Sequence, residues 1–506
     1  MTFTLVIRVE DVMVYGFSPV GALGLLVRVE IDIRHGLPGT DIVGLPGSEV
    51  REARDRVRVA IRNSGFEYPA ERILFNLSPA DVPKIGSGFD LPMALALLQR
   101  SGQVKLPENF VASGELSVRG EVVPVRGTLS AVLAAGDRGI RTVVLGERGA
   151  RSLGPLMGGG PALRVIHTLR ELRGSGLRVP AGRPQRAAGG EEDAGESPSF
   201  DDIVGQPALK WAATVAAAGF HNLLLMGPPG SGKTMAARRL ISLLPDLSPH
   251  DARDVGRIHS MRGLENRLAL RRPPLRMPHH SASLEGVLGG GRAHLPGEVS
   301  LAHRGIMVLD EATEFRPRVL QALREPVERR SVLISRAGHS EEFPAAFQLV
   351  LTSNLCPCGK LGQPDSRCMC SRQELERYWR RVGAALLDRV DIRVRTFYRS
   401  GREDAPDHAE LSEMVRTATR RQHQRLRNEA WSRNGLIPAE ASERLLPLQD
   451  HLQRLLRARM RQLGLSERAA ASVRALARTL ADLADRKEVS PSDILEAAAL
   501  RSPGPP

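Results

Sequence analysis

Apolar positions along the chain change their period, and the changes divide it into blocks. Residues 25–33 alternate apolar and charged side chains like a half-buried strand, whereas residues 48–63 and 91–100 carry helical patterns. From about residue 405 the pattern is helical almost to the C-terminus. The patterning predicts α/β structure for most of the chain and a helical region at its end.

The last part of the helical region gives the sharpest element prediction. Ser466 is a good N-cap residue, and the helix that it begins is expected to continue through Asp485. Apolar side chains recur there at helical spacing and predict a buried stripe of Ala470, Val473, Leu476, Ala477, Leu480 and Leu483.

An apolar run at residues 222–226 leads into Gly-Pro-Pro-Gly-Ser-Gly-Lys-Thr, and helix-forming residues follow. This is a complete phosphate-binding loop in its required strand–loop–helix setting. Backbone N–H groups and the helix N-terminus favour bound phosphate. Lys233 is expected to reach the β- and γ-phosphates of ATP, and Thr234 to hold Mg²⁺. The predicted loop residues are Gly227, Pro228, Pro229, Gly230, Ser231, Gly232, Lys233 and Thr234.

Two later apolar runs end in polar side chains that suit ATP hydrolysis. Residues 305–309 lead into Asp310, which suits Mg²⁺ coordination through water, and Glu311, which suits polarising the attacking water. Residues 348–353 lead into Asn354, which either positions the same water or caps its strand.

Length and composition indicate a globular protein of several domains. The 506 residues suffice for about two to four domains, and 42% of them are hydrophobic. No apolar stretch reaches the roughly 18–20 residues that cross a bilayer, and the N-terminus lacks the basic flank of a signal peptide. We therefore expect a cytoplasmic protein without a membrane partner.

The formal net charge of +14 favours an anionic polymer as partner, with nucleic acid the main candidate. A generally arginine-rich composition would give the same excess. Charge therefore supports a DNA interpretation without establishing it.

All four cysteines lie in one window, at Cys356, Cys358, Cys368 and Cys370. In a cytosolic chain such clustering favours a tetrahedral zinc–thiolate site over disulfides. The Cys-x-Cys spacing is less specific than Cys-x-x-Cys, so free thiols and a redox-sensitive loop remain the alternatives.

The blocks define the predicted domains. Residues 1–172 form an α+β domain, and residues 173–199 are dense in Gly, Pro and charge, as in a flexible linker. Residues 200–400 form the nucleotide-binding α/β core with the cysteine cluster at 356–370, and residues 405–502 form the helical domain.

Beyond the ATPase motifs, further stretches make the chain resemble the ComM/YifB family of magnesium-chelatase-like AAA+ ATPases over nearly its whole length. They are residues 278–283, 289–291, 296–303, 323–326, 334–337, 356–359 and 386–390. The chain departs from the family at Ala312 and Thr313, where Leu-Pro is usual, and at Leu355, where Pro is usual. Neither departure removes a reacting group.

The resemblance implies a homo-hexameric ring with ATP bound between subunits. Arg389 matches the family's arginine finger, which suits the charge of a transferring phosphoryl group. Arg468 matches the second sensor arginine, with Arg474 as a rival. Arg336 lies in a hairpin-like stretch that projects into the pore of related motors, where it would contact DNA; the alternative is a solvated turn.

Residues 41–46, 75–81 and 89–93 make the first block resemble the family's Lon-protease-like domain. Lon chemistry needs a serine activated by a lysine. The serine position falls at Gly88, next to Ser87, and residues 127–133, which match the lysine region, contain no lysine. We interpret the domain as a non-catalytic scaffold.

The resemblance implies a DNA motor, a branch-migration helicase acting in recombination during natural transformation on branched or single-stranded DNA. The alternative is a remodelling or insertion ATPase that acts on a protein partner, as magnesium chelatase subunits do. A protease is disfavoured by the missing Ser–Lys pair. The expected cofactors are ATP and Mg²⁺, with structural Zn²⁺ at the cysteines.

Overall fold

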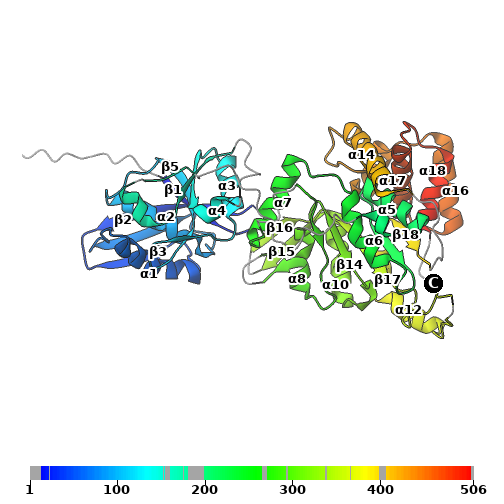
Figure 1. Cartoon of the computed structure of the whole chain (residues 1–506), viewed down its shortest axis with the longest axis horizontal. Helices are drawn as coiled ribbons and strands as arrows, with labels where there is room; N and C mark the ends of the chain where they lie inside the picture. Colours follow the sequence, from blue (N-terminus) through cyan, green and yellow to red (C-terminus); the bar gives the residue numbers. More distant parts are fainter. Residues whose placement is uncertain are drawn as a thin grey trace, which may run out of the picture.

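The computed structural model describes residues 13–21, 23–151, 153, 160–174, 176–179, 199–264, 271–291, 295–336, 339–364, 366–397 and 406–502. An N-terminal domain lies at one end of an elongated molecule, beside a larger body that holds the remaining elements (Figure 1). Among the described helices, none is both long and apolar enough to cross a membrane.

The N-terminal domain is built on a mixed seven-stranded sheet of order β3-β4-β2-β1-β5-β8-β9. The central strands β1, β5 and β8 and the edge strand β9 run parallel, while β2 pairs antiparallel with both β1 and β4. The strands are β1 (Met13–Ser18), β2 (Leu25–Arg34), β3 (Gly39–Val43), β4 (Arg72–Ser78), β5 (Asn109–Ser113), β8 (Thr142–Gly146) and β9 (Ala162–Ile166). A short hairpin joins β6 (Glu115–Leu116) and β7 (Val122–Val123).

Helices cover both faces of this sheet because its strands alternate apolar side chains between the faces. In β5, Phe110 and Ala112 pack with α1 (Ser48–Asn63) and α2 (Asp90–Arg100), whereas Val111 packs with α3 (Thr128–Asp137) on the other face. The helices and the strand predicted in this block are confirmed. Helix α4 (Glu147–Arg151) follows β8.

The second domain contains a parallel five-stranded sheet of order β11-β14-β17-β10-β18. Its strands are β10 (Leu223–Met226), β11 (Leu275–Arg276), β14 (Ile306–Leu309), β17 (Gln348–Ser353) and β18 (Ile392–Arg395). Every residue of β10, β14 and β17 is buried, as expected for a parallel sheet covered on both faces. The three apolar runs predicted as strands are therefore confirmed, and they form the centre of the sheet.

Two layers of helices enclose the second sheet. On one face lie α5 (Pro207–Gly219) and α6 (Lys233–Arg239), and on the other α10 (Pro317–Ala322), α12 (Arg372–Arg380) and α13 (Ala384–Leu387). The remaining elements are α7 (Pro249–Met261), α8 (Leu284–Leu288), α9 (Glu298–Leu301), α11 (Arg324–Arg329), a β12–β13 pair (Gly289–Gly290, Leu295–Pro296) and a hairpin of β15 (Ser331–Arg336) and β16 (His339–Pro344).

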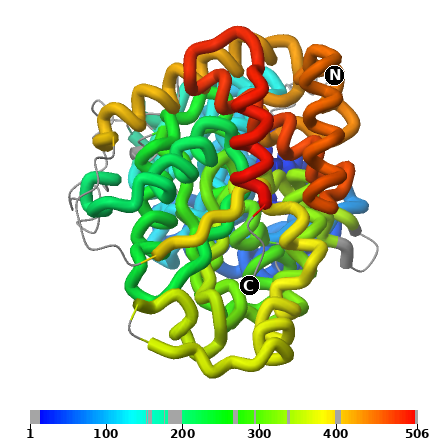
Figure 2. Tube along the Cα trace, turned by 90° about the vertical axis from the view of Figure 1, so that its right-hand side faces the viewer, coloured from blue at the N-terminus to red at the C-terminus, as the bar shows by residue number. Residues whose placement is uncertain are grey.

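The C-terminal region is helical, as predicted, and packs against the α5 face of the second domain. It comprises α14 (His408–Arg425), α15 (Ala439–Leu445), α16 (Asp450–Leu463), α17 (Glu467–Leu483) and α18 (Pro491–Arg501). Ser466 caps α17 by accepting a hydrogen bond from the Ala469 N–H, and the predicted stripe is buried except at half-buried Ala470. Figure 2 shows these helices together at one side of the body.

The first two domains contact each other through α3 and α7. The Ser130 hydroxyl donates to the Arg257 carbonyl over 3.1 Å, and the Gly127 N–H donates to the Ser260 carbonyl over 2.9 Å. Val255 and Met261 of α7 join the apolar cluster under α3. Within the predicted linker at 173–199, Arg178 forms an antiparallel β-bridge with Val165 of the first domain, and residues 175 and 180–198 lie outside the described residues.

Candidate active site

The predicted ATP-site residues meet at the carboxyl edge of the parallel sheet. The loop at 227–234 leaves β10, Asp310 and Glu311 leave β14, and Asn354 leaves β17, which lies between them. Gly230 and Gly232 have φ of 78° and 84°, which glycine adopts without strain. A side chain at Gly227 would collide with Thr396. The loop backbone therefore requires these glycines, and α6 begins directly at Lys233.

Lys233 is the buried cation of this loop. Its side chain is 8% exposed, and its ammonium donates to the carbonyls of Gly227 and Pro228 over 2.8 and 2.7 Å and to Asn354 Oδ1 over 3.3 Å. Burial lowers the pKa of Lys233 to about 8, against the opposing effect of the Asp310 and Glu311 charges. A buried ammonium held by carbonyl oxygens fits an anionic ligand such as phosphate.

Thr234 and Asp310 form the pair predicted to hold Mg²⁺. The Thr234 hydroxyl donates to Asp310 Oδ1 over 2.9 Å, and the Thr352 hydroxyl donates to the same oxygen over 2.6 Å. Mg²⁺ prefers oxygen ligands and usually keeps several waters, so a threonine hydroxyl can bind the ion directly while the neighbouring carboxylate binds one of its waters. The donor set therefore fits a magnesium ion.

Glu311 is exposed at the strand end in a left-handed conformation, with φ 52°. Its backbone N–H donates to the Thr352 hydroxyl over 3.0 Å. This bond ties the turn after β14 to β17. Asn354 lies beside Lys233 through the contact above. The structure thus gathers a carboxylate, an amide and a cation where the phosphates of a nucleotide would end.

Arg389 lies at the other end of these strands, where β10 begins. Its carbonyl accepts from the Asn222 side-chain amide over 2.9 Å, just before β10 begins, whereas the phosphate loop starts at Gly227. Five strand residues span about 16 Å, which exceeds the reach of an arginine side chain. Arg389 therefore does not meet the phosphate loop of its own chain.

Arg468 lies beside Arg389. Arg389 Nε donates to Glu328 Oε2 over 3.1 Å, and Arg468 Nη1 donates to Glu328 Oε1 over 2.6 Å. The rival Arg474 instead points into the helical domain, where it binds Gln453 Oε1 over 2.7 Å and the carboxylate of Glu443 over 3.2 Å. Of the two candidates, only Arg468 shares a face with Arg389.

Family models of the magnesium chelatase ChlI subunit match three consecutive parts of the chain. "Magnesium chelatase, subunit ChlI" matches residues 199–403, its N-terminal counterpart "Subunit ChlI of Mg-chelatase" matches 29–148, and the "subunit ChlI C-terminal" model matches 406–501.

Curated relatives match nearly the whole chain. Competence protein ComM of Haemophilus influenzae is 35% identical over 499 residues, which cover 97% of each chain. YifB of Escherichia coli, an uncharacterised protein, is 36% identical over 492 residues, which cover 94% of each chain. The chain belongs to the ComM/YifB family of magnesium-chelatase-like AAA+ proteins. This membership implies an ATPase that uses ATP and Mg²⁺.

The N-terminal domain is also similar to part of a Lon protease. The Geobacter metallireducens enzyme is 29% identical over 144 residues, which cover 27% of this chain and 17% of that protein. A Cβ at Gly88 would lie 3.2 Å from Ser113 Oγ and 3.3 Å from Val125 Cγ2, so a serine there would need its neighbours to shift.

The four cysteines converge on one point beside the phosphate loop. Cys358 Sγ lies 3.3 Å from Cys356 Sγ and 3.6 Å from Cys368 Sγ, and all four sulfurs lie within 4.8 Å of one another. These distances exceed the about 2.05 Å of a disulfide and approach the about 3.8 Å expected for tetrahedral Zn–S bonds of about 2.3 Å. A backbone hydrogen bond from Lys360 lowers the pKa of Cys358 to about 6, which favours the thiolate.

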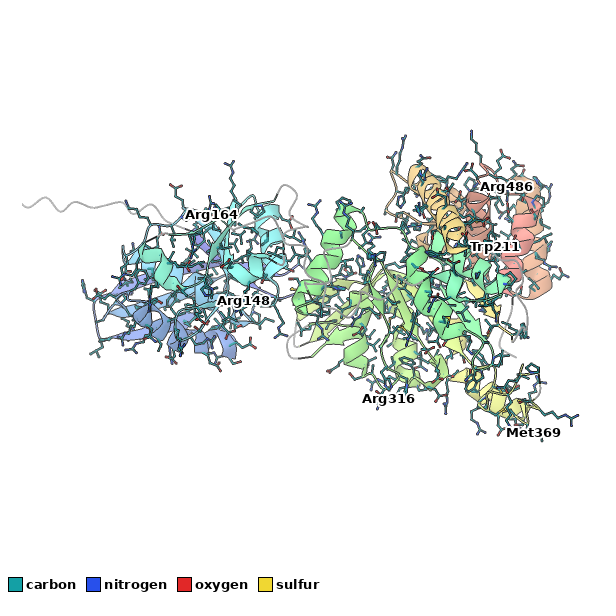
Figure 3. All side chains as sticks on the ribbon, in the orientation of Figure 1. Arg148, Arg164, Trp211, Arg316, Met369 and Arg486 are labelled. Atoms are coloured by element: carbon teal, nitrogen blue, oxygen red, sulfur yellow. The ribbon has the colours of Figure 1, made fainter. Side chains whose placement is uncertain are left out.

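The loop that carries the four cysteines packs against the phosphate loop. It begins right after Asn354, and a Cβ at Gly359 would lie 3.2 Å from Pro229 Cγ. Its other end reaches solvent at Met369, which Figure 3 labels at the tip of the segment that precedes α12. The predicted hairpin around Arg336 is present as β15 and β16, while the Arg336 side chain lies outside the described side chains.

Sequence reasoning missed two contributors. Thr352 joins Asp310 to the Glu311 backbone, and its place two residues before Asn354 on the same strand was the only available sign. Glu328 joins Arg389 and Arg468 across 61 and 140 residues of sequence, a distance at which spacing carries no information.

Proposed function

We propose that the chain is a ring-forming ATP-driven DNA motor, a homo-hexameric helicase that promotes branch migration of recombining DNA during natural transformation. The observation that carries the ring is the separation of the ATP-site residues. The carboxyl ends of the strands carry Lys233, Asp310, Glu311 and Asn354. The opposite ends of the strands lie near Arg389 and Arg468. A complete site then needs two neighbouring copies, related head to tail around a closed ring.

Each residue has a defined role in this site. The loop N–H groups and Lys233 bind the β- and γ-phosphates, and Thr234 and Asp310 would hold the Mg²⁺ that supplies positive charge to those phosphates. Glu311 accepts the proton of the attacking water, which Asn354 orients. Arg389 of the neighbouring copy approaches the γ-phosphate, where a planar guanidinium suits the charge of the transferring group.

The DNA substrate is supported by charge and by kinship. The chain has a net charge of +14. Its relative from Haemophilus influenzae, which matches 97% of this chain, is named a competence protein. The β15–β16 hairpin supplies an element of the kind that we propose contacts DNA in a pore, with Arg336 near its tip.

ATPase rates with single-stranded, duplex and branched DNA test this proposal. DNA should raise the rate, branched DNA at least as well as duplex, and binding should weaken with salt at a log–log slope of about −0.9 per phosphate contact. Arg336→Ala should reduce branch migration more than basal hydrolysis. Arg372→Ala, which removes an equal charge from an exposed site on α12, is the matched control. A flat response of hexameric protein to every DNA would refute the proposal.

The match of all three segments to chelatase subunit models favours one alternative, a remodelling or insertion ATPase with a protein partner. This alternative gives ATPase rates that DNA leaves unchanged and a partner protein raises. The same assay therefore separates the two functions.

We also propose that Cys356, Cys358, Cys368 and Cys370 hold a structural Zn²⁺. The support is the convergence of four thiols without disulfide geometry. Bound zinc would fix the loop between Asn354 and α12, and Gly359 of this loop lies against Pro229 of the phosphate loop. We therefore expect bound zinc to stabilise the conformation of the phosphate loop.

A further inference from the structure

Glu328 is the only described side chain that hydrogen-bonds both Arg389 and Arg468. It lies near the end of α11, and its two carboxylate oxygens are divided between the two guanidiniums. Each arginine has a further anchor, since Arg389 Nη1 donates to the Ala385 carbonyl over 2.7 Å and Arg468 Nε lies 3.9 Å from Asp388 Oδ2. The three side chains form one cluster near the ends of the strands opposite the phosphate loop.

The cluster is partly exposed, as arginines that reach a neighbouring copy must be. The Arg389 side chain is 14% exposed, and those of Glu328 and Arg468 are 47% and 34% exposed. Although burial raises the pKa of Glu328, hydrogen bonds from Arg389 and Arg468 outweigh it, and the pKa of this carboxyl lies below its usual value. The carboxylate is therefore charged at neutral pH.

Two guanidiniums that must approach the same triphosphate repel each other. A shared carboxylate removes most of that repulsion, fixes the direction of both side chains and still leaves one net positive charge. Preorganised charge of this kind lowers the reorganisation needed when the transition state forms.

We infer that Glu328 is a positioning residue that holds Arg389 and Arg468 together for delivery to the ATP bound by the neighbouring copy. The inference rests on the shared ATP site proposed above, but not on DNA as the substrate. Glu328 touches no nucleotide itself. Its loss should leave ATP binding intact and slow turnover.

Three variants of the full chain define the effect. Glu328→Ala should lower kcat for ATP hydrolysis at least about tenfold, compared with about 10³-fold or more for loss of an arginine finger. The Kd of a fluorescent ATP analogue should stay within about twofold. Glu328→Gln, which keeps an oxygen for one arginine, should fall between Ala and wild type. Glu325→Ala removes an exposed carboxylate of α11 that pairs with exposed Arg329, and it should match wild type.

Mixed rings show which site Glu328 serves. Glu328→Ala subunits have an intact phosphate loop, and Lys233→Ala subunits have intact arginines, so roughly one quarter of the interfaces in an equal mixture should be complete. ATPase activity should therefore recover. Glu328→Ala mixed with Arg389→Ala should not recover, because both variants lack positioned arginines. Arg389→Ala mixed with Lys233→Ala is the reference and should recover.

Each other outcome contradicts the inference. Wild-type or raised turnover of Glu328→Ala would show that the carboxylate does not position the arginines. Recovery with Arg389→Ala but not with Lys233→Ala would place Glu328 in its own subunit's site. Recovery with neither, when the reference recovers, would show that loss of Glu328 disables the subunit as a whole and not the two arginines alone. Failure of the reference in verified mixed rings would refute the shared site itself, whereas DNA stimulation would still stand as a separate result.

Discussion

Raising the pH should weaken ATP binding through Lys233. The side chain is buried, and burial lowers its pKa to about 8 in the nucleotide-free chain. Its present partners are two loop carbonyls and the Asn354 amide oxygen, which carry no full charge. Phosphates would bring several negative charges to the same ammonium and raise its pKa. ATP binding is therefore coupled to proton uptake above pH 8.

The direction and size of the change in Kd follow from the pKa values of Lys233 without and with bound ATP. Below pH 8 the lysine is protonated with and without ATP, and the affinity is at its maximum. Above pH 8 the free chain loses the proton that the complex keeps, so Kd rises by about tenfold per pH unit until the pKa of the complex is reached. Between pH 7 and pH 9 we expect an increase of about tenfold.

Titration with a fluorescent ATP analogue at constant free Mg²⁺, from pH 7 to pH 9.5, measures this change. Calorimetry at pH 8.5 in two buffers of different ionisation enthalpy should show proton uptake. The control is Lys233→Arg, whose side chain stays charged, so whatever affinity it keeps should not depend on pH. Thermal unfolding without nucleotide checks that the fold persists. A constant Kd for the unsubstituted chain, without proton uptake, would refute the reasoning.

Two further predictions concern hydrolysis and metal. Glu311→Gln should bind the ATP analogue normally but hydrolyse ATP about 10²–10⁴ times more slowly, because the attacking water loses its base. The control Glu314→Gln, at a nearby exposed site, should keep the wild-type rate. Wild-type hydrolysis by Glu311→Gln would overturn the assignment. Elemental analysis should find about one zinc per chain, and Cys368→Ser should lose it. Met369→Ala is the control and should keep the zinc, because the Met369 side chain is 86% exposed. Metal-free wild-type protein, purified reduced and without chelators, would exclude the zinc site.

The sequence predicted those parts of the molecule that local rules determine. The phosphate loop, the strand before it, the helix after it and the Ser466 cap each follow from a few neighbouring residues, and all are present. Strand β11, with only two residues, carries too little pattern to be recognised. The pairing of Arg468 with Glu328 joins residues 140 positions apart, so only the packing of the helical domain on the second domain creates it.

The contact made by α3 bears on our interpretation of the N-terminal domain as a non-catalytic scaffold. The region predicted to match the Lon lysine, residues 127–133, lies at the start of α3, and the start of α3 contacts the second domain. Ser260 receives the N–H groups of Gly127 and Leu129 through its carbonyl and hydroxyl, and Ser130 donates to the Arg257 carbonyl. A lysine that must reach a substrate cannot also be buried at a domain contact. We therefore interpret α3 as a docking element for α7, which follows the phosphate-loop helix in the chain.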